Sequence, residues 1–408
     1  MSQRAPRRPA WVPAVLAFAA ALAPFPAPAG SAAASPPGAV QPLAPGTVAA
    51  QALPELTLVP PLREARSVAW AGNGRIEVAH ALLLAPQAAL TRTRLLALAQ
   101  AAAGRTFRAR ATLAEVDVSV FLADTYAGPG GPLPAFTASV PRDRLAAFLA
   151  LTPGTLDDFE RLWLNPTPQA GGPDLTPTGA LERDIQPGGT PAELTALKAL
   201  NVHALARGGS SGGLILRGPS GATAVALTFD DAPHPLYEPL LLDDLKAAGA
   251  HATFFIIGRN ARAYPYFLRD MLQAGHELAN HTYHHVRLSG LSASATAQEL
   301  SLANQVIREI TGQAPRYFRP PGGRYTATTL HEAGTLGLTT AFWTDDPADY
   351  TNRPGEATET LLQKALRPGG IVLLHDNVLQ TILELPDFLR DEARVGLRLE
   401  TLSTLAGN

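Results

Sequence analysis

The chain has 408 residues, of which 46% are hydrophobic, so it can bury a sizeable core divided among one to three domains. Its formal net charge of -2 at pH 7 gives no indication of a nucleic-acid partner or of binding to an anionic membrane surface. The sequence contains no cysteine, which excludes a disulfide framework, a thiolate zinc site and a cysteine nucleophile. Any metal must therefore be held by histidine and carboxylate side chains.

Residues 1–34 have the pattern of a secretory signal peptide. Arg4, Arg7 and Arg8 precede an apolar stretch at 10–22, which is short for a bilayer span and is followed by small-residue cleavage motifs. We expect a secreted or cell-envelope protein with no stable membrane insertion after cleavage. The alternative is an uncleaved membrane anchor.

Two segments separate this leader from the C-terminal half. An Ala/Pro-rich linker is expected at 35–55, followed at 56–164 by a small α+β accessory domain of unknown role. Residues 165–221 are rich in Pro, Gly and Thr and are interpreted as a linker with one connecting helix at 191–200. Within the accessory domain, the patterns predict helices at 90–103 and 141–151 and strands at 112–122 and 136–140.

From residue 222 to 408 the pattern changes to short apolar strands that alternate with helices. This alternation predicts an α/β domain with a parallel sheet buried on both faces, whose chemistry lies at the carboxyl ends of the strands. The expected strands are 224–229, 252–257, 338–343 and 370–374, and the expected helices are 240–248, 264–274 and 295–311.

The first half of this domain contains a pair of aspartates and a pair of histidines that could form a site. Asp230 and Asp231 come directly after the first strand, so one carboxylate could ligate a metal while the other acts as a base. His281 and His285 are four residues apart, and on a helical turn they would share one face and suit one divalent ion. Judged separately, an Asp-rich turn and a solvated His-rich loop are the plain alternatives.

Three later segments also carry polar groups. Arg319 is followed by two prolines and then by two glycines, and Gly322 is the first of these glycines. The fixed positive charge of Arg319 can orient a carboxylate. Asp349 and Tyr350 follow a strand, and His375 stands at the end of another. Each segment alone is weak evidence, but five polar clusters in strand-end or loop positions together indicate a site.

In this order the clusters resemble the polysaccharide deacetylase family, also known as the NodB-homology or carbohydrate esterase family 4 fold. The resemblance runs from about residue 222 to 376 and implies a distorted (β/α) barrel, here preceded by the small α+β domain. It also implies a divalent metal, zinc above cobalt, nickel or iron, bound by Asp231, His281 and His285.

The resemblance further implies a role for each remaining residue. It makes Asp230 the base, Arg319 the residue that orients it, His375 the general acid and Asp349 the residue that tunes His375. The family's oxyanion donor corresponds to the backbone N–H of Gly322, where many members have tyrosine. Two other positions depart from the family pattern, with Ala232 in place of glycine and Tyr350 in place of tryptophan.

The expected activity is hydrolysis of N-acetyl groups on an N-acetylglucosamine polysaccharide, such as peptidoglycan or another envelope glycan. Two alternatives stay open from the sequence. One is an O-acetyl esterase acting on acetylated polysaccharide, and the other is an envelope glycan-binding protein with little catalysis.

Overall fold

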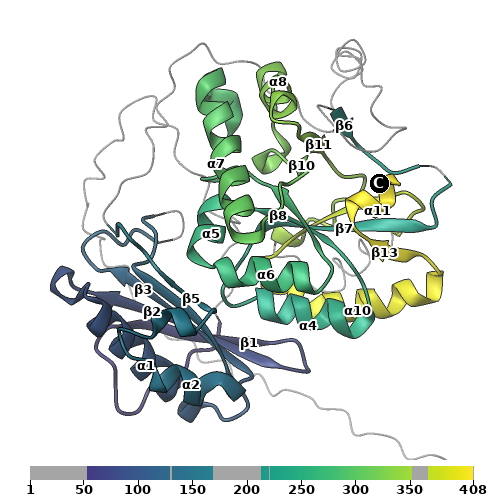
Figure 1. The fold of residues 1–408 in the computed structure, drawn as a ribbon. Coiled ribbons are helices and arrows are strands. Elements are labelled where there is room, and N and C mark those ends of the chain that lie inside the picture. Colours follow the sequence, from purple (N-terminus) through teal and green to yellow (C-terminus); the bar gives the residue numbers. More distant parts are fainter. Residues whose placement is uncertain (1–52, 129–130, 169–212, 220, 352–365, 408) are drawn as a thin grey trace, which may run out of the picture. The chain divides into compact units, whose positions relative to one another are not determined.

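The computed structural model describes residues 53–128, 131–168, 213–219, 221–351 and 366–407, all of which belong to the compact unit Gly38–Asn408 (Figure 1). The expected signal peptide, most of the Ala/Pro-rich linker and the expected helix at 191–200 lie outside the described residues. None of the helices in the described part of the chain has the length and apolar character needed to cross a bilayer.

The accessory domain is a mixed sheet packed against helix α1 (Arg92–Ala109) and the short helix α2 (Leu145–Ala150). Strands β2 and β3 are parallel and are joined through α1, whereas the other neighbours are antiparallel. In sheet order, its strands within the described residues are β1 (Ala65–Gly72), β2 (Glu77–Ala85), β3 (Glu115–Leu122), β4 (Phe136–Pro141) and β5 (Leu162–Leu164).

Helix α1 is longer than expected. The sequence pattern predicted an end at Gly104, but the helix continues to Ala109 and buries Thr106 and Phe107. A glycine inside a helix costs only about 1 kcal/mol relative to alanine. Burial of Phe107 in the accessory core outweighs that cost.

The C-terminal domain is built on a parallel sheet (Figure 1). Within the described residues the strand order is β12-β7-β8-β9-β10-β11-β6, and β13 also pairs with β7. Its strands are β6 (Gly213–Ile215), β7 (Ala224–Ala232), β8 (Thr253–Ile256), β9 (Glu277–Asn280), β10 (Tyr317–Phe318), β11 (Thr339–Ala341), β12 (Ile371–His375) and β13 (Arg398–Glu400).

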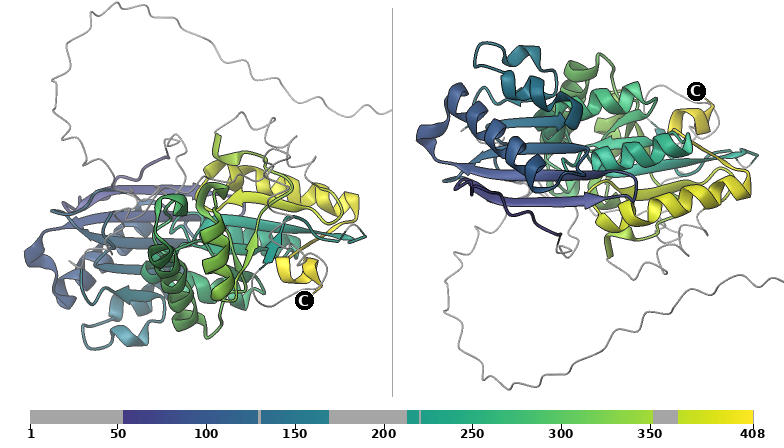
Figure 2. Two further views of the ribbon diagram at one scale, coloured as in Figure 1. Left: turned by 90° about the horizontal axis from the view of Figure 1, so that it is seen from above. Right: turned by 90° about the horizontal axis from the view of Figure 1, so that it is seen from below.

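Helices cover this sheet. Helices α4 and α10 pack against each other, and Figure 2 shows them side by side from below. The helices are α4 (Glu238–Ala248), α5 (Gly258–Ala263), α6 (Pro265–Gln273), α7 (Ala293–Thr311), α8 (Ala327–Thr335), α10 (Leu379–Val395) and α11 (Leu402–Ala406). As expected, α4 and α7 end at glycines with left-handed backbone, Gly249 and Gly312.

The strand path is open, but a loop returns to its first strand. After β11 the chain forms an isolated parallel bridge between Asp345 and Val372, so the segment beyond β11 lies against β12. This arrangement is a parallel half-barrel, and the expected fold class of a distorted (β/α) barrel preceded by a small α+β domain is confirmed. Strand β6 lies within the segment interpreted as a linker and pairs with β11, so the sheet begins before residue 222.

The accessory domain contacts helix α4 of the C-terminal domain through side-chain interactions. Arg75, in the turn between β1 and β2, pairs with Asp243 at 2.9 Å and with Asp244 at 2.5 Å on α4. Ala71 and Val78 belong to the same apolar core as the buried side chains of β7. The accessory sheet is therefore packed against the C-terminal domain rather than joined to it by a linker alone.

Candidate active site

Strand β7 carries the two aspartates at its carboxyl end. All nine residues of this strand are buried, as expected for a strand with neighbours on both sides. The strand runs past the predicted end at Phe229 and includes both Asp230 and Asp231. Its register against β8 shifts between Phe229 and Ala232, and Asp231 has a φ of 72°. The irregular backbone turns the two adjacent carboxylates toward different partners.

The two candidate metal-binding histidines, His281 and His285, follow β9 but do not lie in a helix. The expected helical turn from His281 to His285 is wrong, because the chain leaves β9 in a bend with left-handed backbone at Thr282 (φ 67°) and at His285 (φ 58°). The backbone N–H of His285 donates to the Thr282 hydroxyl at 3.0 Å and stabilises the bend. The two imidazole centroids are nevertheless only 5.0 Å apart.

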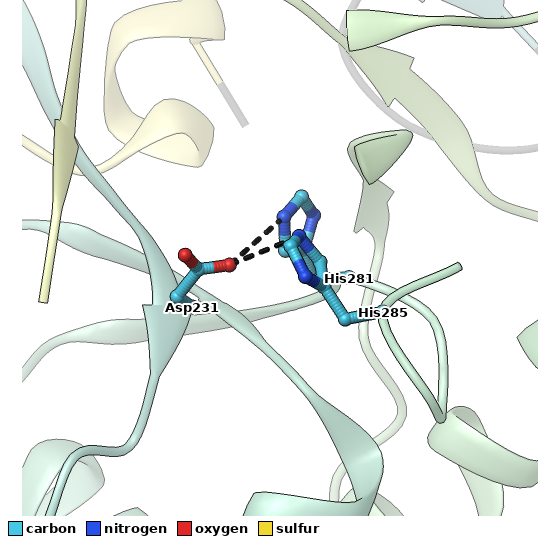
Figure 3. A group of neighbouring side chains, drawn as sticks. All are labelled: Asp231, His281 and His285. Atoms are coloured by element: carbon cyan, nitrogen blue, oxygen red, sulfur yellow. Dashed lines mark ion pairs between the residues drawn. The ribbon is translucent and has the colours of Figure 1, made fainter. Parts of the chain in front are cut away.

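Asp231, His281 and His285 converge on one buried point (Figure 3). The Nε2 atoms of His285 and His281 lie 3.1 Å and 3.6 Å from Oδ1 of Asp231. Ligands at about 2.0–2.1 Å from one tetrahedral ion lie roughly 3–3.5 Å from each other. The donor set of two imidazoles and one carboxylate thus fits a divalent cation in both chemistry and spacing.

The protonation state of His281 suits a metal ligand. Its Nδ1 lies 2.8 Å from the backbone oxygen of Arg319, so the proton belongs on Nδ1 and Nε2 keeps its lone pair. Burial lowers the pKa of His281 to about 3, and the neighbouring His285 adds to this effect. The neighbouring His284 instead pairs with Glu299 at 2.7 Å.

Arg319 is fully buried and binds the carboxylate of Asp230. Its Nη1 donates to Oδ1 of Asp230 at 2.6 Å and to the hydroxyl of Thr228 at 3.0 Å. Its Nε and Nη2 donate to the backbone oxygens of Ala341 and Phe342, each at 3.2 Å. The guanidinium is therefore fixed by strands on both sides, and it holds Asp230 with Oδ2 at 3.7 Å from Nε2 of His281.

His375 and Asp349 form a second ion pair beside the first. Nδ1 of His375 lies 2.8 Å from Oδ1 of Asp349, and its backbone N–H donates to Oδ2 at 2.8 Å. Burial disfavours the charged imidazolium, but the charge and hydrogen bond of Asp349, with contributions from Asp231 and Asp230, raise the pKa of His375 to about 10. The imidazole is accordingly protonated at neutral pH.

The two predicted substrate-side residues lie on exposed loops. Tyr350 is 39% exposed, and its ring meets that of His375 edge-on with centroids 5.3 Å apart. Gly322 is exposed in the short turn Pro321–Gly323, three residues after Arg319, and its φ of 64° favours glycine. A Cβ atom added there would meet nothing within 4 Å.

Two further polar residues contact the site, and the sequence analysis did not identify them. Asn377 donates from Nδ2 to Oδ2 of Asp231 at 3.0 Å, and Thr381 donates to Oδ2 of Asp349 at 2.6 Å. Both lie just after His375 in the chain. Their position near that motif was the one available signal, and neither residue type alone indicates a role.

Comparison with known proteins gives a coherent result. Residues 217–341 match the family model described as polysaccharide deacetylase. A chitooligosaccharide deacetylase from Sinorhizobium fredii is 39% identical over 162 residues, which cover 39% of this chain and 75% of that protein. A peptidoglycan-N-acetylglucosamine deacetylase from Bacillus cereus is 35% identical over 192 residues, which cover 46% of this chain and 90% of that protein.

Solved structures also match the C-terminal half. A family 4 carbohydrate esterase from Streptomyces lividans in complex with acetate is 31% identical, with a TM-score of 0.42, and the match covers 44% of this chain and 93% of that one. A carbohydrate esterase family 4 pseudoenzyme from Bacillus anthracis is 28% identical, with a TM-score of 0.46, and the match covers 48% of this chain and 69% of that one.

Proposed function

Because this chain belongs to the polysaccharide deacetylase family, we propose that it is a metal-dependent hydrolase that removes N-acetyl groups from a polysaccharide containing N-acetylglucosamine. The observation that carries this proposal is the convergence of Asp231, His281 and His285 beside Asp230. The names of the relatives, deacetylases of chitooligosaccharide and of peptidoglycan N-acetylglucosamine, support the choice of substrate class.

Asp231, His281 and His285 would hold the divalent cation, with zinc as the proposed ion and cobalt, nickel or iron as alternatives. When bound, the cation would supply a Lewis acid that polarises the acetyl carbonyl and makes water more acidic. The family assignment and the donor set support a metal, and the choice of zinc rests on the mixed nitrogen and oxygen ligands.

Asp230 is proposed as the general base. Arg319 binds one oxygen of this carboxylate, so the other oxygen, which lies near His281, is left to accept a proton from the attacking water. The ion pair with Arg319, in which Nη1 lies 2.6 Å from Oδ1, holds the carboxylate of Asp230 in place.

His375 is proposed as the general acid that protonates the leaving amine. Its pKa of about 10 means that the imidazole carries a proton before the reaction, and Asp349 holds the ring through Nδ1. The ring's other nitrogen is then the one that can deliver a proton. Tyr350 is proposed as an aromatic wall for the sugar, and the backbone N–H of Gly322 as an oxyanion donor.

The proposed location is outside the cytoplasm. The signal-peptide pattern at 1–34 supports secretion, and the substrate class proposed above is found in cell envelopes. We propose the division into domains as stated from the sequence, with the deacetylase domain extended to include β6. The substrate would then be an acetylated glycan of the envelope.

Acetate release from N-acetylglucosamine oligomers and from peptidoglycan tests the activity. The zinc-loaded protein should release acetate, and chelation should stop the release. Asp231→Asn should reduce both zinc binding and turnover, whereas the control Asp243→Asn, on helix α4 outside the site, should change neither. Absence of acetate release by the zinc-loaded protein would refute the proposal. Faster release from acetylated xylan than from amide substrates would favour the esterase alternative.

A further inference from the structure

Asn377 lies in the turn between β12 and α10, at the edge of the candidate metal site. Strand β12 runs parallel to β7, with His375 opposite Asp230, and the N–H of Asp376 donates to the backbone oxygen of Asp230 at 2.9 Å. Two residues after His375, in the turn that follows β12, the side chain of Asn377 lies against Asp231. Its Nδ2 donates to Oδ2 of that carboxylate at 3.0 Å.

The two oxygens of Asp231 therefore have different surroundings. Oδ1 faces the two imidazoles at 3.1 Å and 3.6 Å, and Oδ2 accepts the amide hydrogen of Asn377. A carboxylate on a single bond can otherwise rotate and present either oxygen, because its terminal torsion is broad. The hydrogen bond from Asn377 removes this freedom and directs Oδ1 toward His281 and His285.

The orientation of the amide is set by Asp231 itself. With Oδ1 of Asn377 turned toward the carboxylate, two oxygens would face each other without a proton, which is repulsive. In the observed orientation the NH₂ group meets the carboxylate. Oδ1 of Asn377 is buried and has no hydrogen-bond partner among the described residues.

Two ordinary roles for an asparagine in a turn do not account for this side chain. An Asx-turn or a helix N-cap requires the side-chain oxygen to accept a hydrogen bond from a backbone N–H two or three residues later. Oδ1 of Asn377 accepts no such bond within the part of the chain that the structure describes. Among the described residues, the polar contact that explains an amide here is the bond to Asp231.

We propose that Asn377 is a positioning residue that holds the carboxylate of Asp231 in the orientation needed to bind the cation. The inference deepens the proposed function and rests on it, because it concerns the ligand set of the same site. Partners of ligating groups typically change metal affinity by about 10–100-fold when they are removed.

The test compares Asn377→Leu with Asn165→Leu. Leucine keeps the branch of asparagine at Cγ and removes the donor. Asn165 is a matched control because it is half-buried and its Nδ2 also donates to an oxygen at 3.0 Å, the backbone oxygen of Pro134 in the loop before β4. Zinc affinity is measured on the metal-free chains by competition with a chromogenic chelator, and the site geometry by the visible spectrum of the cobalt-loaded chains.

Asn377→Leu should weaken zinc binding by about 10–100-fold and alter the cobalt spectrum, whereas Asn165→Leu should match the unmodified chain in both. Equal zinc affinity and an equal cobalt spectrum for Asn377→Leu and the unmodified chain would overturn the inference and leave the proposed function standing. If the unmodified chain bound neither zinc nor cobalt, both proposals would fail.

A second variant covers the case in which the leucine variant does not fold. Asn377→Ser keeps a small polar residue that turns accommodate, but its shorter side chain withdraws the donor from Asp231. The same loss of zinc affinity is expected. If Asn377→Ser folded and bound zinc as tightly as the unmodified chain, Asn377 would act only as part of the turn. That result would overturn the inference.

Discussion

At the scale of single residues, the pair of His375 and Asp349 illustrates how one contact sets a protonation state. A buried histidine ordinarily becomes harder to protonate, as His281 does with its pKa of about 3. His375 is half-buried, yet its pKa is about 10 because the charge and hydrogen bond of Asp349 outweigh the effect of burial and stabilise the imidazolium. The two histidines therefore suit opposite roles, one as a neutral ligand and one as a proton donor.

Replacement of this carboxylate by a neutral amide tests the assignment. Because the folded pKa of His375 is raised, its protonated form is present below that pKa and is lost as the pH rises through it. Asp349→Asn should lower the pKa, so the basic limb of the kcat–pH profile should move to lower pH. A loss of about 10²–10⁴-fold in kcat is expected once the general acid is deprotonated.

Thr381→Val is the matched control for this prediction. It removes the hydroxyl that donates to Oδ2 of Asp349 at 2.6 Å but keeps the negative charge beside His375. Its basic limb should move much less than that of Asp349→Asn. Coincident pH profiles for Asp349→Asn and the unmodified chain would contradict the proposed role of Asp349.

At the scale of elements, irregular backbone occurs in the segments at the strand ends that carry the site residues. The non-glycine residues with positive φ in the described chain are Asp231, Thr282, His285 and Ala348. Three of these lie in the segments that carry the metal-type ligands, and the fourth precedes Asp349. Left-handed backbone costs such residues about 1–2 kcal/mol each, so the regular strands and helices around them must hold these conformations.

Two glycines that flank regular elements allow the energetic cost of left-handed backbone to be measured. Gly312, after α7, and Gly369, before β12, both have a φ of 73°. A Cβ atom at Gly312 would meet nothing within 4 Å, whereas one at Gly369 would lie 2.5 Å from the backbone oxygen of Pro219. Substitution of each by alanine therefore imposes the same backbone strain but different crowding.

Gly312→Ala should lower the free energy of unfolding by about 1–2 kcal/mol from backbone strain alone. Gly369→Ala should lower it by a further 1–3 kcal/mol or so, because the added methyl group overpacks the entry to β12. Urea unfolding of both variants provides the comparison. Equal decreases in the free energy of unfolding for the two variants would show that the backbone near Pro219 shifts without an energetic penalty.

At the scale of the whole molecule, buried carboxyl groups link stability to pH. Asp117 on β3 is fully buried, and neither of its oxygens has a hydrogen-bond partner among the described residues. Burial, with the negative charge of Glu115, raises the pKa of Asp117 well above its usual value, although Arg161 opposes this. The folded chain therefore keeps a proton on Asp117 that the unfolded chain releases above about pH 4.

The sign of the resulting pH dependence follows from this difference in bound protons. Where the folded state binds more protons than the unfolded state, the free energy of unfolding decreases as the pH rises. Each such proton contributes a slope of about 1.4 kcal/mol per pH unit between the two pKa values. The Asp117→Asn variant has no titratable carboxyl group at this position, so its unfolding free energy should decrease less steeply as the pH rises above about 4.

The exposed Asp157→Asn in the same domain is the control, and it should keep the slope of the unmodified chain. Urea unfolding at several pH values measures the three slopes. If Asp117→Asn and the unmodified chain had the same slope, Asp117 would not be the group that holds the proton in the folded state.

Much of the C-terminal fold could be predicted from local patterns. Glycines at 249 and 312 end α4 and α7, and the apolar runs at β7, β8 and β12 are buried strands. The short strands β6, β10 and β13 were missed, because two or three residues carry no readable periodicity. In the accessory domain, β1 and β2 were also missed, and α1 continued past the glycine expected to end it.

The sequence by itself determined which residue types stand at the strand ends, and the order of these polar clusters indicated the family. The catalytic roles given to Asp230, Arg319, Asp349 and His375 stay predictions until activity is measured. The spacing of His281 and His285 did not predict how their side chains meet. A helical turn was expected, whereas the structure has a bend with left-handed backbone.

Only the tertiary structure decided which distant side chains touch. Asn377 and Asp231 are 146 residues apart, and they meet because β12 pairs with β7 in one particular register. Arg319 reaches Asp230 across 89 residues for a similar reason, through β10 and its neighbours. Local propensity depends on neighbours in the chain, whereas register depends on how the whole sheet buries its side chains, and so the contacts appear only when the sheet is assembled.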